Sequence, residues 1–145
     1  MKRLLCRKLL SILVLSILVA STLVGCGQSC MLTIFSTSGG NVSVMKAGTA
    51  TWIGAQGGMS LGPGDTMKCG DNSTAEITFV DGTIIELQAG TEIEVVSLAC
   101  TDTGSITIIL EETIGNLIFR VTKIVDPASR YEVETPTGAA AVRGS

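Results

Sequence analysis

Two alternating segments joined by an Asp-Gly pair constrain the fold of this chain more than any other stretch. Within Ser73–Val96, apolar and polar residues alternate before Asp81-Gly82 and again after it. A period of two is typical of a strand with one buried and one solvated face. Asp-Gly supplies the positive φ values of a tight hairpin turn. A third segment, joined by Ala89-Gly90, continues the alternation, so we expect a three-stranded β-meander here.

The rest of the chain carries strand and turn signals and no sustained helical period. Alternating or β-branched runs predict further strands over residues 32–35, 42–44, 66–68, 105–110, 116–123 and 130–134. Glycine- and proline-rich turns separate them. We therefore expect an all-β fold, either a single antiparallel β-sandwich or an irregular barrel-like sandwich of about nine or ten short strands. The lone Trp52 is expected to fill the core of this domain.

The first 25 residues have the pattern of a secretory signal. Four basic residues among the first eight precede an uncharged stretch from Leu9 to Val24, as in the n- and h-regions of a signal peptide. We expect this stretch to form a hydrophobic signal helix. Sixteen helical residues span roughly 24 Å, which is short of a hydrocarbon core of about 30 Å. A permanent membrane span is therefore the less favoured alternative.

The h-region ends in Leu23-Val24-Gly25-Cys26, which resembles the lipobox of bacterial lipoproteins. The resemblance implies cleavage before Cys26, a diacylglycerol on its sulfur, and a protein anchored to a membrane of the bacterial envelope, outside the cytoplasm. The alternative is that Cys26 lies by chance beside an ordinary cleavage site. The expected organisation is a signal peptide over 1–25, a tether over 26–31 and one β domain over 32–145.

Charge and cysteine content limit the partners and the covalent links. Beyond the signal, six basic residues stand against thirteen acidic ones, a net charge of about −7 that argues against a nucleic-acid partner. Cys30, Cys69 and Cys100 remain for a non-cytosolic setting. We prefer a Cys69–Cys100 disulfide because Cys30 lies in the tether; buried or unpaired thiols are the alternative.

The side-chain inventory gives little support to catalysis. The sequence has no His, which removes the Ser-His and Cys-His dyads and the commonest metal ligand. The pairs Glu92/Glu94 and Glu132/Glu134 are expected to lie on a solvated strand face rather than to form a carboxylate pair or a calcium site. Arg143 is expected to pair with a strand carboxylate near the chain end. We expect no enzyme activity, no cofactor and no metal.

Five motifs, in order, resemble those of the FecR-like domain family. They are similar to its G-x-V-x-V strand, its L-x-x-G-D-x-V turn, its F-x-D-G-S/T-x-I-x-L hairpin, its later G-x-V/I strand and its ending F-x-V-x-T-P-x-A-x-x-x-V-R-G-T. In this chain they occupy residues 38–44, 61–66, 70–87, 116–121, and 131–137 with 142–145. The turn and motif residues of the resemblance are Gly64, Asp65, Asp81, Gly82, Pro136, Arg143 and Gly144.

The resemblance implies a role in extracytoplasmic signalling. The family is known for regulators of iron uptake that carry a cytosolic, sigma-factor-controlling region, a membrane span and then this domain. Only eight residues precede the h-region here, so we expect no sigma-factor control by this chain alone. The expected function is a non-enzymatic lipoprotein that senses or binds a partner protein or an envelope component, attached to the membrane through Cys26.

Two alternatives stay open, a passive structural module of the envelope and an iron-uptake type regulator that acts with a separate sigma-factor partner. An enzyme acting on cell-wall material is the least favoured. Family members normally continue past the point where this chain ends at Ser145. We therefore expect a truncated domain with an unpaired sheet edge.

Overall fold

The chain forms a two-layered β structure. The computed structural model describes residues 30–122 and 126–143, and within them every regular element is a strand. The all-β prediction is confirmed. In chain order the strands are β1 (Leu32–Ser38), β2 (Val42–Met45), β3 (Trp52–Gly54), β4 (Ser60–Leu61), β5 (Thr66–Cys69), β6 (Thr74–Thr78), β7 (Ile84–Leu87), β8 (Glu92–Cys100), β9 (Ile106–Ile114), β10 (Leu117–Arg120), β11 (Arg130–Thr135) and β12 (Gly138–Arg143).

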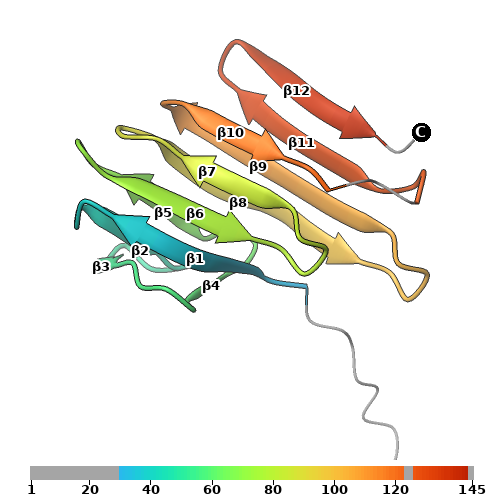
Figure 1. Ribbon diagram of the computed structural model, residues 1–145, viewed down its shortest axis with the longest axis horizontal. Coiled ribbons are helices and arrows are strands. Elements are labelled where there is room, and N and C mark those ends of the chain that lie inside the picture. The colour runs from blue at the N-terminus through green and yellow to red at the C-terminus, as the bar shows by residue number, and fades with distance from the viewer. Residues whose placement is uncertain (1–29, 123–125, 144–145) are drawn as a thin grey trace, which may run out of the picture.

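The strands form two facing sheets (Figure 1). One sheet has five strands in the order β10-β7-β6-β1-β4, and the other has seven in the order β12-β11-β9-β8-β5-β2-β3. Their inner faces alternate with solvated outer faces, and the inner side chains form one core, which includes Ile34, Ile77, Ile93 and Leu110. Burying each such side chain contributes about 1.5–3 kcal/mol. The described pairings are antiparallel except for the parallel pair of β9 and β11.

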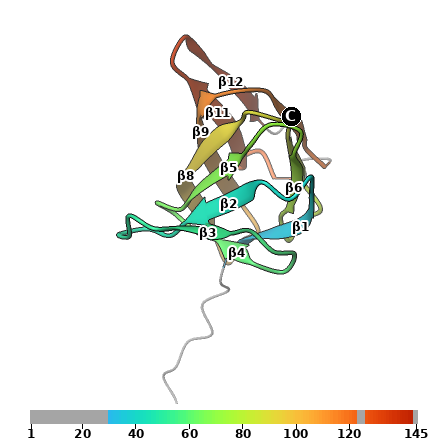
Figure 2. The ribbon, with the colours of Figure 1, turned by 90° about the vertical axis from the view of Figure 1, so that its left-hand side faces the viewer.

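The chain closes one edge of the sandwich and leaves the other open. Backbone bonds join Ala55 to Val42 of β2 (2.9 Å) and Gly58 to Ile34 of β1 (2.8 Å), so the segment between β3 and β4 bridges the two sheets. β3 and β4 are the edge strands on this side, and Figure 2 shows them at the lower end of the ribbon. At the opposite edge lie β10 and β12. The structure is thus barrel-like on one side and a sandwich on the other.

The predicted three-stranded meander is wrong in its third strand. β6 and β7 pair as predicted, but β8 pairs with β5 and β9 in the other sheet. The crossing follows from backbone bonds of the turn: Gly90 N–H donates to Cys69 O (3.0 Å), and Cys69 N–H donates to Thr91 O (2.8 Å). Alternation specifies which face of a strand is buried, and the strands of both sheets face the same core. It therefore could not assign β8 to a sheet.

The turn between β6 and β7 has three loop residues rather than two. Phe79 N–H donates to Thr83 O (3.0 Å), and Gly82 N–H donates to Phe79 O (3.0 Å). Of the loop residues Val80, Asp81 and Gly82, only Gly82 has a positive φ, +85°. The prediction of positive φ at this turn is therefore confirmed for the glycine and wrong for Asp81.

Trp52 does not fill the core. It lies on the edge strand β3, where it is 40% exposed and all three strand residues are exposed. Among the described strands β3 pairs with β2 alone, so none of them covers its other side. Strands β3, β4 and β12 were not predicted: β3 has no buried face, β4 has two residues, and the Ala-rich β12 sequence has no polar–apolar alternation.

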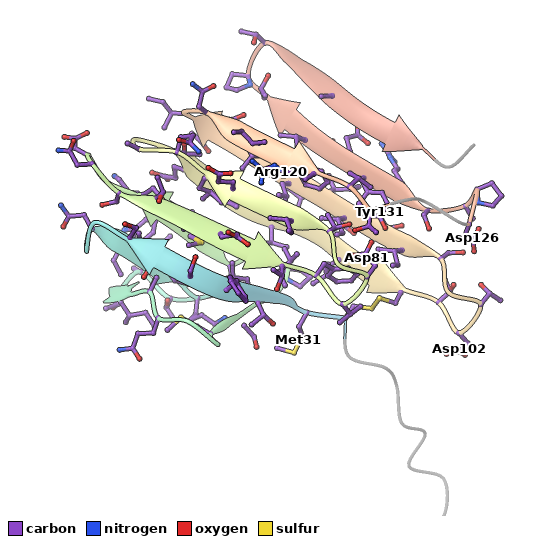
Figure 3. The ribbon with its side chains drawn as sticks, in the orientation of Figure 1. Met31, Asp81, Asp102, Arg120, Asp126 and Tyr131 are labelled. Carbon is purple, nitrogen blue, oxygen red and sulfur yellow. A yellow bond between two sulfur atoms is a disulfide. The ribbon has the colours of Figure 1, made fainter. Side chains whose placement is uncertain are left out.

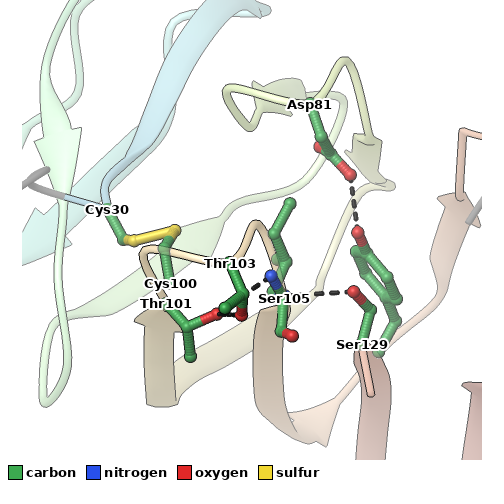
Figure 4. The surroundings of a disulfide bond; sticks show 9 residues. Cys30, Asp81, Cys100, Thr101, Thr103, Ser105 and Ser129 are labelled. Atoms are coloured by element: carbon green, nitrogen blue, oxygen red, sulfur yellow. Dashed lines mark hydrogen bonds between the residues drawn. A yellow bond between two sulfur atoms is a disulfide. The ribbon is translucent and has the colours of Figure 1, made fainter. Parts of the chain in front are cut away.

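The predicted Cys69–Cys100 disulfide is wrong. The bond joins Cys30 to Cys100, as Figure 4 shows, and the Cα atoms of the two residues are 5.9 Å apart. Cys69 lies on the inner face of β5, fully buried and unpaired. Cys100 is the last residue of β8, and Cys30 precedes β1 at the same end of the molecule. The directions of β1 and β8 place Cys30 and Cys100 together. The spacing of the cysteines in the sequence does not specify these directions.

We expect Gly82→Val to destabilise the protein by about 1–2 kcal/mol, because a side chain with a Cβ is strained at positive φ. Guanidinium unfolding of both proteins measures this difference. Gly138→Val is the matched control, because Gly138 lies at ordinary φ with no atom within 4 Å of an added Cβ. Equal unfolding free energies for wild type and Gly82→Val would contradict the turn conformation.

We expect native protein to resist thiol alkylation at Cys69, because burial raises the pKa of this thiol to about 11.

Cys30→Ser should lower the unfolding free energy by up to about 4 kcal/mol, because the lost disulfide closes a long loop, with a sequence separation of 70. Cys69→Ser should keep the disulfide. Peptide mapping without reductant, showing Cys69 linked to Cys100, would contradict this pairing.

Candidate functional site

The predicted motif residues Gly64 and Asp65 form a structural junction. Asp65 is 4% exposed and accepts hydrogen bonds from the Ala47 N–H (2.8 Å) and the Gly62 N–H (2.9 Å). It also pairs with Lys46, whose ammonium donates to a backbone carbonyl of β4 (2.8 Å). Gly64, at φ +81°, donates to a carbonyl of β8 (2.7 Å). The turn thus joins β2, β4 and β8 rather than presenting a free carboxylate.

The second motif carboxylate, Asp81, connects the two sheets. It accepts the hydroxyl hydrogen of Tyr131 on β11 (2.6 Å), and both the N–H (2.9 Å) and the hydroxyl (2.8 Å) of Thr83. Figure 3 labels Asp81 and Tyr131 as they face each other. Burial is the largest cause that raises the pKa of Tyr131, and the Asp81 carboxylate raises it further. The pair is therefore a neutral phenol donating to a carboxylate, a structural tie with no free acid or base.

Three of the residues that the sequence singled out cannot be compared in full with the structure. Cys26 and Gly144 lie outside the described residues, so lipidation stays a prediction. The backbone of Arg143 pairs with Arg130 across β12 and β11, while its side chain lies outside the described ones, and its pairing with a carboxylate also stays a prediction. Pro136 lies in the turn between β11 and β12.

Three carboxylates form a row across the outer face of the seven-stranded sheet. Glu94 of β8 lies opposite Glu111 of β9, which lies opposite Glu134 of β11. All three side chains are exposed. This carboxylate row extends the predicted solvated face, and sequence reasoning missed Glu111 because no second acidic residue follows it at a spacing of two.

The carboxylate row has no countercharge among the described side chains. Lys68 and Arg130, on the same face, pair instead with Glu92 (3.7 Å) and Glu132 respectively. Like charges directly opposite each other destabilise a sheet. The row therefore carries an electrostatic cost that a cationic partner would remove.

A small pocket lies at the end of the same sheet, where β9 ends and β11 turns into β12. We call it the corner pocket. Its volume is about 260 Å³, and its lining residues are Glu112, Thr113, Ile114, Gly115, Thr135, Pro136 and Thr137. Another open pocket, of about 320 Å³, lies near β3 and contains Lys68, which Glu92 already pairs.

The wall of the corner pocket is fixed by a close backbone approach. Gly115 has φ +120°, and a Cβ there would lie 2.3 Å from the Cα atom of Thr91. The Thr91 hydroxyl donates to Asn116 O (2.9 Å) and accepts from Asn116 N–H (3.0 Å). On the other side, the Thr135 hydroxyl donates to Gly138 O (2.8 Å). The pocket is therefore formed by the fold itself.

Glu112, one of the residues that line the corner pocket, carries an unsatisfied polar atom. Its Oε1 atom is shielded from solvent and has no hydrogen-bond partner in the part of the chain that the structure describes. A buried acceptor without a donor is unfavourable. The residue pairs with Ile93 on β8, whose side chain faces the core, so a glutamate occupies an inward position. Sequence reasoning missed it, although the adjacent Glu111-Glu112 pair breaks strand alternation and could have signalled it.

The described residues hold no cluster of three or more His, Cys, Asp or Glu side chains arranged for a metal ion. Across residues 30–122 and 126–143 no helix has the length and apolar character needed to cross a membrane.

We expect Asp65→Asn to lower the unfolding free energy at pH 7 by about 1–3 kcal/mol, through the loss of charge-assisted hydrogen bonds. Burial opposes ionisation of Asp65, but the hydrogen bonds from Lys46, Gly62 and Ala47 outweigh it and lower the pKa below its ordinary 3.8. The unfolded chain therefore binds more protons as pH falls through this range. This contribution is present above the ordinary pKa and is lost as pH falls through the folded-state pKa.

Urea unfolding of wild type and Asp65→Asn from pH 7 to about pH 3 measures both effects. The variant should show a weaker decline of stability with acid. Asp102→Asn, in an exposed loop, is the control. Identical stability and pH profiles for wild type and Asp65→Asn would contradict the role of the junction.

Sequence comparison identifies the family. A model of the family described as FecR protein matches residues 65–145. No curated protein and no solved structure matches the chain significantly. The matched region includes the Gly82 turn, the Asp81–Tyr131 tie, the carboxylate row and the corner pocket. Since the match spans more than half of the sequence, the chain belongs to the FecR protein family.

Proposed function

We propose that this protein is a non-enzymatic lipoprotein of the bacterial envelope whose FecR domain binds a partner protein or an envelope component in signal transduction. The family match over residues 65–145 carries the proposal. The FecR family is a family of regulatory domains associated with iron-uptake type signalling and with the envelope, so membership supports a regulatory role outside the cytoplasm.

The state of the polar groups supports binding over catalysis. Asp65 and Asp81 are each saturated by hydrogen bonds within the protein, so neither is available as an acid or base. Glu94, Glu111 and Glu134 are exposed, in register and without countercharge among described residues. A surface that is costly for folding and open to solvent favours a role in recognition.

The disulfide supports a location outside the cytoplasm. Disulfides persist in oxidising compartments and are rare in the cytosol, and Cys30 joins Cys100 here. Cys30 follows Cys26 by four residues. A lipid on Cys26 would therefore place the domain close to the membrane surface, with a tether of a few residues.

We expect the full chain, produced in bacteria with a clickable fatty acid, to incorporate the label at Cys26. Cys26→Ser removes the sulfur that carries the lipid, so its labelling should fall to background. Equal labelling of the two proteins would contradict lipidation.

Capture of tagged full chain from detergent-solubilised envelope tests binding. Wild type should retain a stoichiometric partner, and Glu94→Gln/Glu111→Gln/Glu134→Gln should lose it because the carboxylate row is neutralised. The control Asp71→Asn/Glu76→Gln/Asp102→Asn removes the same charge elsewhere and should retain it. No stoichiometric partner with wild type would favour a passive structural module over this proposal.

A further inference from the structure

We propose that β12 pairs edge to edge with β12 of a second copy of this chain, in antiparallel orientation and about a twofold axis that passes through Ala141. The pairing joins the two seven-stranded sheets into one continuous sheet. This inference goes beyond the proposed function, because it concerns a second copy of the chain and leaves Glu94 and Glu111 open to an envelope partner.

The first argument is the unprotected edge of the seven-stranded sheet. β12 is the outermost strand of this sheet in Figure 1 and pairs with β11 alone among the described strands. Natural sheets protect such edges with very short strands, charges, prolines or bulges. The other edge strands β3, β4 and β10 have three, two and four residues. β12 has six, with no proline and with its one charged residue, Arg143, at the end, so it is the edge best suited to accept another strand.

The second argument is the small and exposed surface of β12. Residues 138–141 are a glycine and three alanines, and all four are exposed. This includes Ala140, although its partner Val133 on β11 is buried in the core. A strand that adds to a sheet edge binds through main-chain hydrogen bonds. Side chains as small as these leave the backbone of the edge accessible to such a strand.

The third argument is the distribution of charge along the edge. At one end of β12, Ala139 lies opposite Glu134, the last member of the carboxylate row. At the other end, Arg143 lies opposite Arg130. The edge therefore has an acidic end and a basic end on the same face of the sheet, and like charges directly opposite each other are unfavourable at both.

An antiparallel twofold contact places the basic end of one copy against the acidic end of the other. With the axis through Ala141, Ala139 lies opposite Arg143 of the second copy, and the contact is repeated at the other end because a twofold interface is reciprocal. Glu134 and that Arg143 are then two strand spacings apart, about 10 Å, with the methyl group of Ala139 between them. A glutamate and an arginine can together bridge this distance, so the second copy supplies a countercharge to the row.

The charges also select the position of the axis. Residues that lie opposite each other in a sheet share a face, so a twofold axis perpendicular to the sheet passes through a residue of β12. An axis through Ala140 would place Arg143 opposite Thr137, which lies in the turn before β12. The axis through Ala141 instead places Arg143 at the end of the carboxylate row.

Cysteine crosslinking in envelope membranes of bacteria that produce the full chain tests the axis. Ala141→Cys places two cysteines opposite each other, so mild oxidation should give a disulfide-linked dimer on a non-reducing gel. Ala139→Cys is the matched control on the same strand and face. Its two copies lie four residues apart along the strands, roughly 14 Å, which is too far for a disulfide. Wild type controls for the native cysteines and should give no linked dimer.

Analytical ultracentrifugation of the purified full chain in detergent tests the edge. Wild type should sediment as a concentration-dependent dimer. Ala141→Lys sets two like charges opposite each other and should be monomeric where wild type is dimeric. Its melting temperature should not change, because the residue is exposed. Thr103→Lys adds the same charge in an exposed loop and should remain dimeric.

A charge exchange tests the identity of the added strand. Glu134→Arg should raise the dissociation constant of the dimer about fivefold or more, because it sets a cation beside Arg143 of the second copy. Adding Arg143→Glu to the same chain reverses both charges and should restore the wild-type dissociation constant.

Each of these measurements can overturn the pairing. No linked dimer from Ala141→Cys, or equal linking by Ala139→Cys, would contradict the axis. A dimeric Ala141→Lys or a monomeric Thr103→Lys would contradict the edge contact. If Arg143→Glu fails to restore the affinity lost in Glu134→Arg, the charge match that identifies the second copy is wrong.

Discussion

The packing of two inner sheet faces on each other is the interaction on which the rest of this structure depends. Each strand contributes alternate side chains to one core, and residues such as Ile34, Ile77 and Ile93 are removed from solvent. Because β7 and β8 belong to different sheets, the chain must cross between the layers at Gly90-Thr91, where it bonds to Cys69 of β5. The same crossing carries the Thr91 hydroxyl that holds the loop before β10.

The buried and half-buried carboxylates divide into two groups by how completely the fold satisfies them. Asp65 and Asp81 accept several hydrogen bonds each and tie strands together. Glu112 is half-buried, and one of its oxygens has no donor among the described residues. The first two carboxylates therefore stabilise the fold, whereas the unmet oxygen of Glu112 costs free energy.

The sequence was informative wherever the signal is local. Alternating and β-branched runs predicted nine of the strands, and the glycine of the Asp81-Gly82 turn has the positive φ expected of it. Long-range placement was not predictable, because the face pattern of β8 is the same in either sheet and cysteine spacing does not show that Cys30 and Cys100 meet. The exposed Trp52 and the edge strand β12 lack the alternation that marks a covered strand. Glu112 was missed although the Glu111-Glu112 pair interrupts the alternation of β9, and only the assembled structure shows that one of its oxygens is unmet.

Site-specific photo-crosslinking of the full chain in its native envelope tests the central claim most directly. A photoreactive residue at Thr113, which is exposed and follows the row residue Glu111 by two positions on β9, should give one discrete adduct with a partner protein, and Glu94→Gln/Glu111→Gln/Glu134→Gln in the same chain should abolish that adduct. The same residue at Thr78, on the outer face of the five-stranded sheet, should give none. An adduct from Thr78 alone, or a Thr113 adduct unchanged by the triple substitution, would contradict the assignment of the carboxylate row as the recognition surface.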